Sequence, residues 1–285
     1  MLLHEVNDSF LEEVVDFKKA RYVILPVPMD ITTTYLKGTK FGPRSIIEAS
    51  RSLENYNFEL DYEVKDIVFT ANELELPPEP NECMGIIHQT VSDLLMDDKI
   101  PILLGGEHTI TYGASLAFDR DVVFVIFDAH ADMKRHVKGS ELNHASNSRL
   151  INKRNPVVLI GVRSLSLEDK KDLEDAGLRC IYQDIVDKDG SLSELVSSIR
   201  GKKVYLSIDM DVFDPSIAPG VGTPQPGGMT YHQVLRYIRE ILSSSKLAGF
   251  DISETRPIAD NNTTEILASK LVIDIVSLNE MSHKI

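Results

Sequence analysis

Cysteine, tryptophan and long apolar runs are scarce or absent in this sequence. The 285 residues include two cysteines and no tryptophan, and Cys83 and Cys180 lie far apart without metal-ligand spacing. A disulfide framework or a zinc–thiolate site is therefore not expected, and such cysteine usage is typical of the reducing cytoplasm. No apolar run approaches the ~20 residues that a membrane-spanning helix requires. The first residues, MLLHEVNDSF, also lack the pattern of a signal peptide, so we expect a cytoplasmic protein without a membrane partner.

Positive charge is also in deficit. The chain has 30 Lys and Arg against 44 Asp and Glu, a formal net charge of −14. This balance argues against a nucleic-acid partner, because binding to phosphates requires a basic surface. It is compatible with a small cationic substrate, although many ordinary globular proteins are equally acidic. No low-complexity linker or internal repeat interrupts the chain, so we expect a single domain over residues 1–285.

Short apolar runs alternate with amphipathic stretches along the chain. Strands are expected at residues 22–27, 101–106, 122–128, 156–162, 179–183, 203–209 and 247–253. Helices are expected at residues 82–97, 111–118, 166–176, 191–200, 230–243 and 263–278. Nearly continuous apolar strands separated by helices indicate an α/β fold with a parallel sheet covered on both faces. The Gly- and Pro-rich segment 213–229 is predicted to be a structured functional loop.

Acidic and imidazole groups follow four of the expected strands. They are Glu107 and His108, then Asp128, His130 and Asp132, then Asp209, Asp211 and Asp214, and finally Asp251 and Glu254. In open parallel sheets the carboxyl ends of the strands form the ligand crevice. Alternate residues of an extended chain face the same way, so Asp128, His130 and Asp132 are expected to point to one place, as are Asp209 and Asp211.

Several carboxylates around one cavity repel each other unless protons or cations neutralise them. Oxygen-rich ligands with one or two histidines and no thiolate favour Mn²⁺, Fe²⁺ or Mg²⁺. The candidate ligands are His108, Asp128, His130, Asp132, Asp209 and Asp211. Six ligands suit two ions ~3.5–4 Å apart better than one ion with an open position. A capped turn or a core histidine would explain each motif alone, but their coincidence at strand ends favours a pair of metal ions.

The same segments carry a family resemblance. GGEHTI (105–110), DAHAD (128–132), SIDMDVFDPSIAPGVGTPQPGG (207–228) and GFDISETRP (249–257) resemble the signature segments of the ureohydrolase family, which includes arginases and agmatinases. The stretch LPVPMDITTTYLKGTKFGPRSIIEAS (25–50) is similar to that family as well. The resemblance implies a three-layer α/β/α sandwich around a mostly parallel sheet. It also implies two Mn²⁺ ions per chain, hydrolysis of a guanidino group to urea and an amine, and a homo-oligomer, either trimer or hexamer.

The resemblance also implies a role for each matching residue. One ion would be held by His108, Asp128, Asp132 and Asp209. The other would be held by Asp128, His130, Asp209 and Asp211, so that Asp128 and Asp209 bridge the pair. Glu254 would pair with the guanidinium, and Asp211 would pass the proton of the nucleophilic water to the leaving amine. His144 would contact the substrate or shuttle protons, while Gly222, Thr223, Gly227 and Gly228 would shape the loop.

Two features differ from the family pattern. Ala145 stands where a glycine often follows the histidine, and the loop after the DAHAD motif carries Lys134, Arg135 and Lys138. Cations facing the pocket, including Arg256, would favour a substrate with a carboxylate tail, whereas cations facing solvent would not affect the choice. The direction of these side chains is left open by the sequence.

The predicted function is an agmatinase-type amidinohydrolase that converts agmatine, a small cationic guanidino substrate, to putrescine and urea. An arginase or another guanidino-acid hydrolase is the alternative within the family. It is less favoured because the loop after DAHAD has only Ser140 and Asn143 as polar groups of the kind that recognise an amino acid. A single-zinc, deacetylase-like hydrolase and a non-catalytic family member are the remaining alternatives, and the complete ligand set disfavours both.

Overall fold

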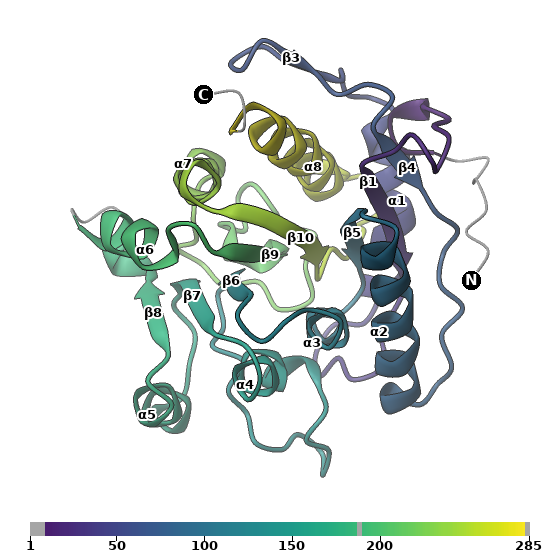
Figure 1. The fold of residues 1–285 in the computed structure, drawn as a ribbon. Coiled ribbons are helices and arrows are strands. Elements are labelled where there is room, and N and C mark those ends of the chain that lie inside the picture. Colours follow the sequence, from purple (N-terminus) through teal and green to yellow (C-terminus); the bar gives the residue numbers. More distant parts are fainter. Residues whose placement is uncertain (1–8, 187–189, 283–285) are drawn as a thin grey trace.

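An eight-stranded parallel sheet runs through the centre of the molecule (Figure 1). The computed structural model describes residues 9–186 and 190–282. The strands are β1 (Tyr22–Val27), β4 (Val68–Thr70), β5 (Ile100–Gly105), β6 (Val123–Phe127), β7 (Val157–Val162), β8 (Arg179–Tyr182), β9 (Lys203–Asp209) and β10 (Lys246–Ser253). Their order in the sheet is β4-β1-β5-β10-β9-β6-β7-β8. A separate antiparallel hairpin pairs β2 (Tyr56–Asn57) with β3 (Tyr62–Glu63).

Helices cover both faces of the sheet (Figure 1). One layer consists of α1 (Gly42–Ser50), α6 (Ser191–Ile199), α7 (Tyr231–Ser244) and α8 (Thr263–Ser282). The other consists of α2 (Pro80–Met96), α3 (Thr109–Ser115), α4 (Asn147–Asn152) and α5 (Leu167–Asp175). Single 3₁₀ turns lie at Phe10–Glu12, Thr39–Phe41, His144–Ser146, Gln183–Ile185 and Met210–Val212. The predicted three-layer α/β/α sandwich is confirmed.

The apolar strands belong to two hydrophobic cores, one on each face. Tyr22 and Ile24 of β1 pack into the core under α1 and α8, whereas Val23 and Leu25 pack into the core under α2 and α3. Successive side chains of a strand point to opposite faces, and both faces are covered here. This double burial explains why the strands are continuous apolar runs rather than alternating ones.

Some elements were not predicted. The sequence analysis missed α1, α4, β4 and the hairpin, because these are short or lack a clear periodic pattern. The strands expected at 22–27 and 203–209 have the predicted ends, and the ends of the other elements differ by at most four residues, as for the helix expected at 263–278 that extends to Ser282. Within residues 9–186 and 190–282, no helix is long and apolar enough to cross a membrane.

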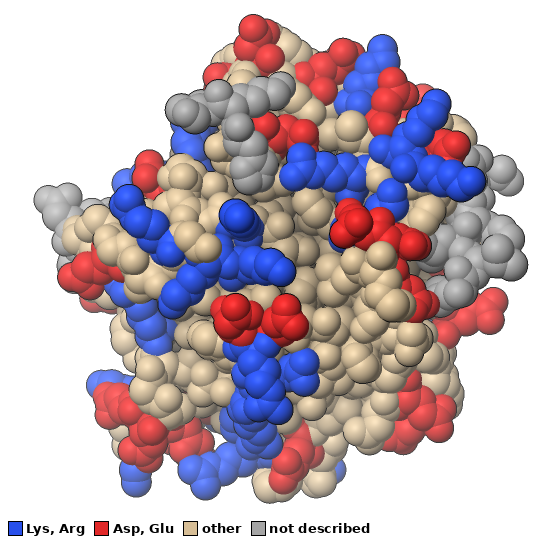
Figure 2. All heavy atoms as spheres, in the orientation of Figure 1, with Lys and Arg blue, Asp and Glu red and all other residues tan. Residues whose placement is uncertain are grey.

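The strand order determines where chemistry can occur. Strands β5, β10, β9 and β6 are neighbours in the sheet, although β5 and β10 are separated in the chain by four other strands. Because all four are parallel, their carboxyl ends meet at one edge. On the face shown in Figure 2, the charged side chains form separate basic and acidic groups rather than one continuous basic patch.

Candidate metal centre

Three carboxylates surround one nitrogen of His108. Its Nδ1 atom lies 3.1 Å from Asp128 Oδ2, 3.3 Å from Asp132 Oδ2 and 3.3 Å from Asp209 Oδ2. The histidine follows β5, and the carboxylates follow or end β6 and β9. The carboxyl ends of β5, β9 and β6 thus place these groups around a single point, where a cation would have one nitrogen and three oxygens within reach.

A second cluster adjoins the first. His130 Nδ1 lies 2.9 Å from Asp211 Oδ2 and 3.5 Å from Asp128 Oδ1. Asp128 therefore presents one carboxylate oxygen to each cluster, which is the arrangement needed to bridge two ions. The ligand atoms of His108, Asp128 and Asp132 lie within 4.8 Å of one another, as do those of Asp128, His130 and Asp211. All six predicted ligands are thus brought together.

The backbone reaches this arrangement in a way the sequence analysis did not predict. The expected extended alternation is wrong, because β6 ends at Phe127 and the chain turns, with Asp132 at a φ of +49°. Asp211 lies in a 3₁₀ turn, where its N–H donates to Asp209 Oδ1 at 2.8 Å. Turned backbone lets neighbouring carboxylates approach one point more closely than a strand repeat of ~6.6–7 Å would allow.

The electrostatics of the clusters fit bound cations. Burial raises the pKa of Asp209 and Asp211, and burial with the Asp128 charge raises that of Asp132 to about 6. Burial would lower the pKa of His130, but Asp211 and Asp128 outweigh it and raise that pKa to about 12. The buried Asp128 Oδ2 has no hydrogen-bond partner in the described structure. Divalent cations would satisfy this atom and replace the protons that the site otherwise retains.

Metal binding to the metal-free protein is therefore expected to release protons at pH 7. His108 and His130 have pKa values raised above their ordinary value, so both carry protons at this pH that an ion must displace. Affinity should rise with pH between 6 and 8. Calorimetric titration with Mn²⁺ in buffers of different ionisation enthalpy measures the release. A binding heat that is the same in every buffer, together with an affinity that does not change with pH, would contradict this expectation.

A buried hydrogen-bond chain orients His108 from behind. His108 Nε2 lies 2.9 Å from Ser207 Oγ, and Ser207 Oγ donates to Asp251 Oδ1 at 2.8 Å. Thr111 Oγ1 lies 3.0 Å from Ser207 Oγ. Since Ser207 gives its proton to Asp251, its oxygen accepts from Nε2–H, and this tautomer leaves the Nδ1 lone pair directed at the three carboxylates. The sequence analysis placed Asp251 at the strand end but missed Ser207, which lies two residues before Asp209 and so on the same side of β9.

Replacing Asp251 with asparagine is expected to weaken metal binding by about 10–100-fold, the usual cost of removing an outer partner of a metal-bound histidine. Competition with a fluorescent chelator measures the affinity. Asp274→Asn is the matched control, because Asp274 is also buried but lies on α8 among Asn57 and Lys270. Equal affinities for the two variants would refute a positioning role for Asp251.

Glu254 borders the clusters without joining them. It is 3% exposed and adopts a φ of +62°, and its N–H donates to Gly106 O at 2.8 Å. Glu254 Oε1 accepts from the backbone N–H of His108 at 2.8 Å. A Cβ on Gly222 would lie 3.4 Å from Glu254 Oε2, so the glycine keeps space beside this second oxygen. The carboxylate is therefore fixed through one oxygen, while the other remains available to a ligand.

His144 lies next to Glu254. Its Nδ1 atom is 3.7 Å from Glu254 Oε1, and its Nε2 atom is 3.1 Å from Thr34 Oγ1. Burial would lower the pKa of His144, but the Glu254 carboxylate raises it to about 9. Ala145 lies in the 3₁₀ turn His144–Ser146 without a positive φ. The alanine in place of a family glycine is therefore compatible with this backbone.

Glu107 holds the loop that covers His144. Its Oε2 atom accepts from the N–H groups of Ile31 and Thr32 at 2.6 Å each. Thr32 Oγ1 donates to Glu107 Oε1 at 2.6 Å and accepts from the backbone N–H of His144 at 2.9 Å. Sequence analysis did not assign these contacts, although Glu107 precedes a predicted ligand. Glu107 thus acts as a loop anchor rather than as a ligand.

The Gly- and Pro-rich segment 213–229 is ordered around the second cluster. Thr223 Oγ1 lies 3.3 Å from Asp211 Oδ2, and the N–H groups of Gly227 and Gly228 donate to Asp214 Oδ2. The half-buried guanidinium of Arg163 donates to backbone oxygens of this segment, including Gln225 O at 2.7 Å. Arg163 was missed, because a lone arginine after a strand carries no recognisable signal. The loop is therefore held in place through the Asp214 carboxylate and through its backbone carbonyl groups.

The cations of the loop after the DAHAD motif are mostly paired. Lys134 Nζ lies 2.8 Å from Asp169 Oδ2, and Arg135 lies 2.7 Å from Asp172 Oδ1. Lys138 is exposed. Arg256 Nε donates to Lys37 O at 2.9 Å. Of these four, Lys134 alone lines the cavity of about 350 Å³ beside His130 and Asp132, which also includes Ser166 and Asp169.

A parallel α/β sheet with two adjoining His/Asp clusters at its strand ends defines a metalloenzyme with a two-ion site. The arginase family model matches residues 20–277. An agmatinase of Pyrococcus horikoshii is 33% identical over 284 residues, covering 98% of this chain and 99% of the relative. An N(1)-aminopropylagmatine ureohydrolase of Synechocystis is 30% identical, with 93% and 91% covered.

A solved structure agrees with these relatives. The crystal structure of an agmatine ureohydrolase of Thermoplasma volcanium superposes with a TM-score of 0.90 at 33% identity, covering 97% of this chain and 96% of that one. The protein belongs to the arginase family and is a ureohydrolase of that family, for which a binuclear metal site is implied.

Proposed function

We propose that this protein is a manganese-dependent hydrolase that cleaves the guanidino group of agmatine to give putrescine and urea. The observation that carries the proposal is the buried carboxylate of Glu254, which is fixed beside the His108 cluster with one oxygen available. A guanidinium suits this carboxylate, because it combines a positive charge with N–H donors that can be directed at the available oxygen. Relatives named agmatinase support the same choice.

The ligand roles follow from the two clusters. His108, Asp128, Asp132 and Asp209 would hold one ion, and Asp128, His130, Asp209 and Asp211 the other. Two Mn²⁺ ions held there would lower the pKa of a water to near neutrality, which would supply a nucleophile for the guanidinium carbon. The two oxygens of Asp128 face different clusters, which suits a bridging role. Mn²⁺ fits the oxygen-rich donor set better than a thiolate-preferring ion would.

The remaining residues bind the substrate and move protons. Glu254 would orient the guanidinium, with Gly222 keeping the space that the planar group needs. Asp211, which lies beside His130 in the second cluster, would take a proton from the nucleophilic water and give it to the leaving amine. With its pKa raised to about 9, His144 carries a proton at neutral pH in the absence of substrate. A guanidinium bound to Glu254 would compete for the carboxylate that raises this pKa, so substrate binding would prepare His144 to release its proton.

The cavity beside the clusters favours a cationic tail. Its lining includes Asp169 and Asp132, and its one lysine, Lys134, is already paired with Asp169. A carboxylate-bearing tail would therefore meet no unpaired lysine or arginine among the lining residues. A primary ammonium, as in agmatine, would meet carboxylate and hydroxyl oxygens instead.

N(1)-aminopropylagmatine is the second candidate substrate. Relatives with that activity in their names match at 30% and 32% identity, and the 350 Å³ cavity has room for a longer amine tail. Comparing kcat/KM for agmatine, N(1)-aminopropylagmatine and arginine with the Mn²⁺-loaded protein separates these cases. Agmatine is expected to be preferred, and arginine to be poorest. If arginine is preferred, the agmatinase proposal is wrong while the family assignment stands.

Replacing Lys134 with methionine is expected to raise kcat/KM for agmatine by about 3–10-fold. The half-exposed ion pair between Lys134 and Asp169 contributes about 1 kcal/mol, and without it Lys134 no longer competes with the substrate ammonium for the Asp169 carboxylate. Arg135→Met is the control, since Arg135 is paired with the same helix but does not line the cavity. Both variants are compared by urea release. The same change in both would mean that the substrate tail does not reach Asp169.

A further inference from the structure

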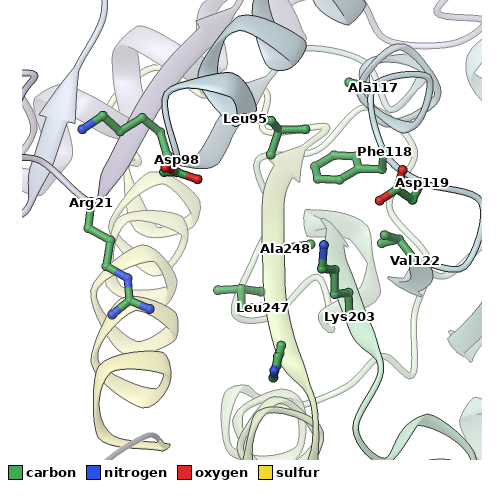
Figure 3. A pocket seen from close by; sticks show the side chains of 12 residues that line it. Arg21, Leu95, Asp98, Ala117, Phe118, Asp119, Val122, Lys203, Leu247 and Ala248 are labelled. Atoms are coloured by element: carbon green, nitrogen blue, oxygen red, sulfur yellow. The ribbon is translucent and has the colours of Figure 1, made fainter.

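A larger cavity opens at the other edge of the sheet. It has a volume of about 500 Å³ and lies where the parallel strands begin (Figure 3). Arg21 and Lys99 directly precede β1 and β5, and Lys203 and Lys246 begin β9 and β10. The seven residues of β9 separate this edge from the metal centre, a distance of roughly 20 Å at ~3.3 Å per residue. The cavity is therefore separate from the proposed catalytic site.

Apolar side chains form the inner wall of this cavity. They are Leu95, Ala117, Phe118, Val122, Leu247 and Ala248. In Figure 3, Leu95 lies beside the Phe118 ring, and Ala248 and Lys203 lie below that ring. Small-molecule sites are typically ~300–1,000 Å³ hollows with apolar walls and a small number of placed polar groups. The cavity has this volume and an apolar inner wall, while its charged residues lie at the rim.

Two lysines at its rim lie side by side. Lys203 and Lys246 are direct partners in the register of β9 and β10, so their side chains leave the same face of the sheet. Both are exposed, and neither forms an ion pair with any residue in the described part of the chain. Like charges directly opposite each other on neighbouring strands are destabilising. In a chain of net charge −14, this uncompensated pair is a ready position for an anion.

The other charges at the rim limit where an anion can bind. Arg21 Nη1 already contacts Glu280 Oε1 at 2.8 Å, and Lys99 Nζ donates to Ala20 O at 2.7 Å. The carboxylates of Asp98 and Asp119 also line the cavity and would repel an anion near them. The favourable position is therefore beside the two strand lysines.

We propose that this cavity is a second ligand site, for a small organic anion. A carboxylate or phosphate group would lie between Lys203 and Lys246, and an apolar or aromatic group would pack against Leu95 and Phe118. The anionic head gains two charge-assisted contacts and relieves the repulsion of the lysine pair. The apolar group gains from burial in the inner wall.

Calorimetric titration of the Mn²⁺-loaded full chain with phenyl phosphate, benzoate and inorganic phosphate tests the proposal. Saturable binding is expected, with at least one aromatic anion binding more tightly than inorganic phosphate, and the comparison of phenyl phosphate with benzoate identifies the preferred head group. The double variant Lys203→Met, Lys246→Met should bind the preferred probe at least tenfold more weakly. Lys65→Met with Lys170→Met is the control, because both lysines are exposed and neither lines the cavity. Any anion held at the metal centre binds equally in all three proteins, so a difference in probe affinity among them comes from binding in this cavity.

Thermal melting gives a second, independent readout. Without added anion, the Lys203→Met, Lys246→Met variant should melt at a higher temperature than the Lys65→Met, Lys170→Met control, because the repulsion between the strand lysines is removed. Urea release by the variant shows that it is folded. Equal probe binding by all three proteins, no saturable binding by the unmodified protein, or an unchanged melting temperature would each overturn the proposal.

Discussion

Replacing Asp128 with asparagine is expected to remove most of the bound metal and to lower urea release by more than about 10³-fold, the loss of over about 4 kcal/mol of barrier lowering. One oxygen of Asp128 faces each ligand cluster. An amide nitrogen in place of one oxygen cannot ligate a cation, so at least one cluster loses a ligand. Metal content by mass spectrometry and urea release from agmatine measure the two effects.

Asp214→Asn is the matched control for this substitution. Asp214 lies near the same strand ends, but its Oδ2 atom accepts from the backbone N–H groups of Gly227 and Gly228, contacts that an asparagine oxygen retains. The substitution removes the exposed contact of Oδ1 with the N–H of Ser216. Metal content and activity should stay within a few-fold of the unmodified protein. An Asp128→Asn protein with two bound ions and full activity would show that the clusters are not the metal centre.

Replacing Glu254 with glutamine is expected to lower kcat/KM for agmatine by about 10²–10³-fold while leaving metal content unchanged. The amide keeps an oxygen for the N–H of His108, so the fold around the ligand is preserved. It loses the negative charge that pairs with the guanidinium, and removing one partner of a buried charge pair costs about 2–5 kcal/mol. Urea release at varied substrate concentration, with metal analysis on the same preparation, measures both properties.

Glu265→Gln serves as the control for the Glu254 variant. Glu265 is also a buried glutamate, 3% exposed, but it lies in the first turn of α8. Its replacement should leave kcat/KM nearly unchanged. If Glu254→Gln lost metal as well as activity, Glu254 would support the metal site rather than bind substrate.

The sequence predicted the layers and the ligands because both depend on local patterns. Continuous apolar runs identified the buried strands, and acidic motifs after those runs identified the side chains that the structure brings together in the two clusters. The strand order was not predictable in the same way. β10 lies between β5 and β9 in the sheet although it is the last strand of the chain, and nothing local encodes that position.

Other failures came from contacts between distant segments. The orientation of Lys134 depends on Asp169, which is 35 residues away and belongs to α5. Ser207 and Asp251 meet through the pairing of β9 and β10. The prediction that the metal motifs continue as extended strand was wrong. The chain turns after the end of β6, so the side chains do not follow the strand repeat. The single domain, the cytoplasmic location and the trimeric or hexameric assembly stay predictions.

Titration of the metal-free protein with Mn²⁺, followed by urea release from agmatine, tests the two-ion ureohydrolase most directly. Activity is expected to rise with added metal and to level off at two ions per chain. A plateau at one ion per chain, or two tightly bound ions with no urea released from any guanidino compound, would contradict the proposed function.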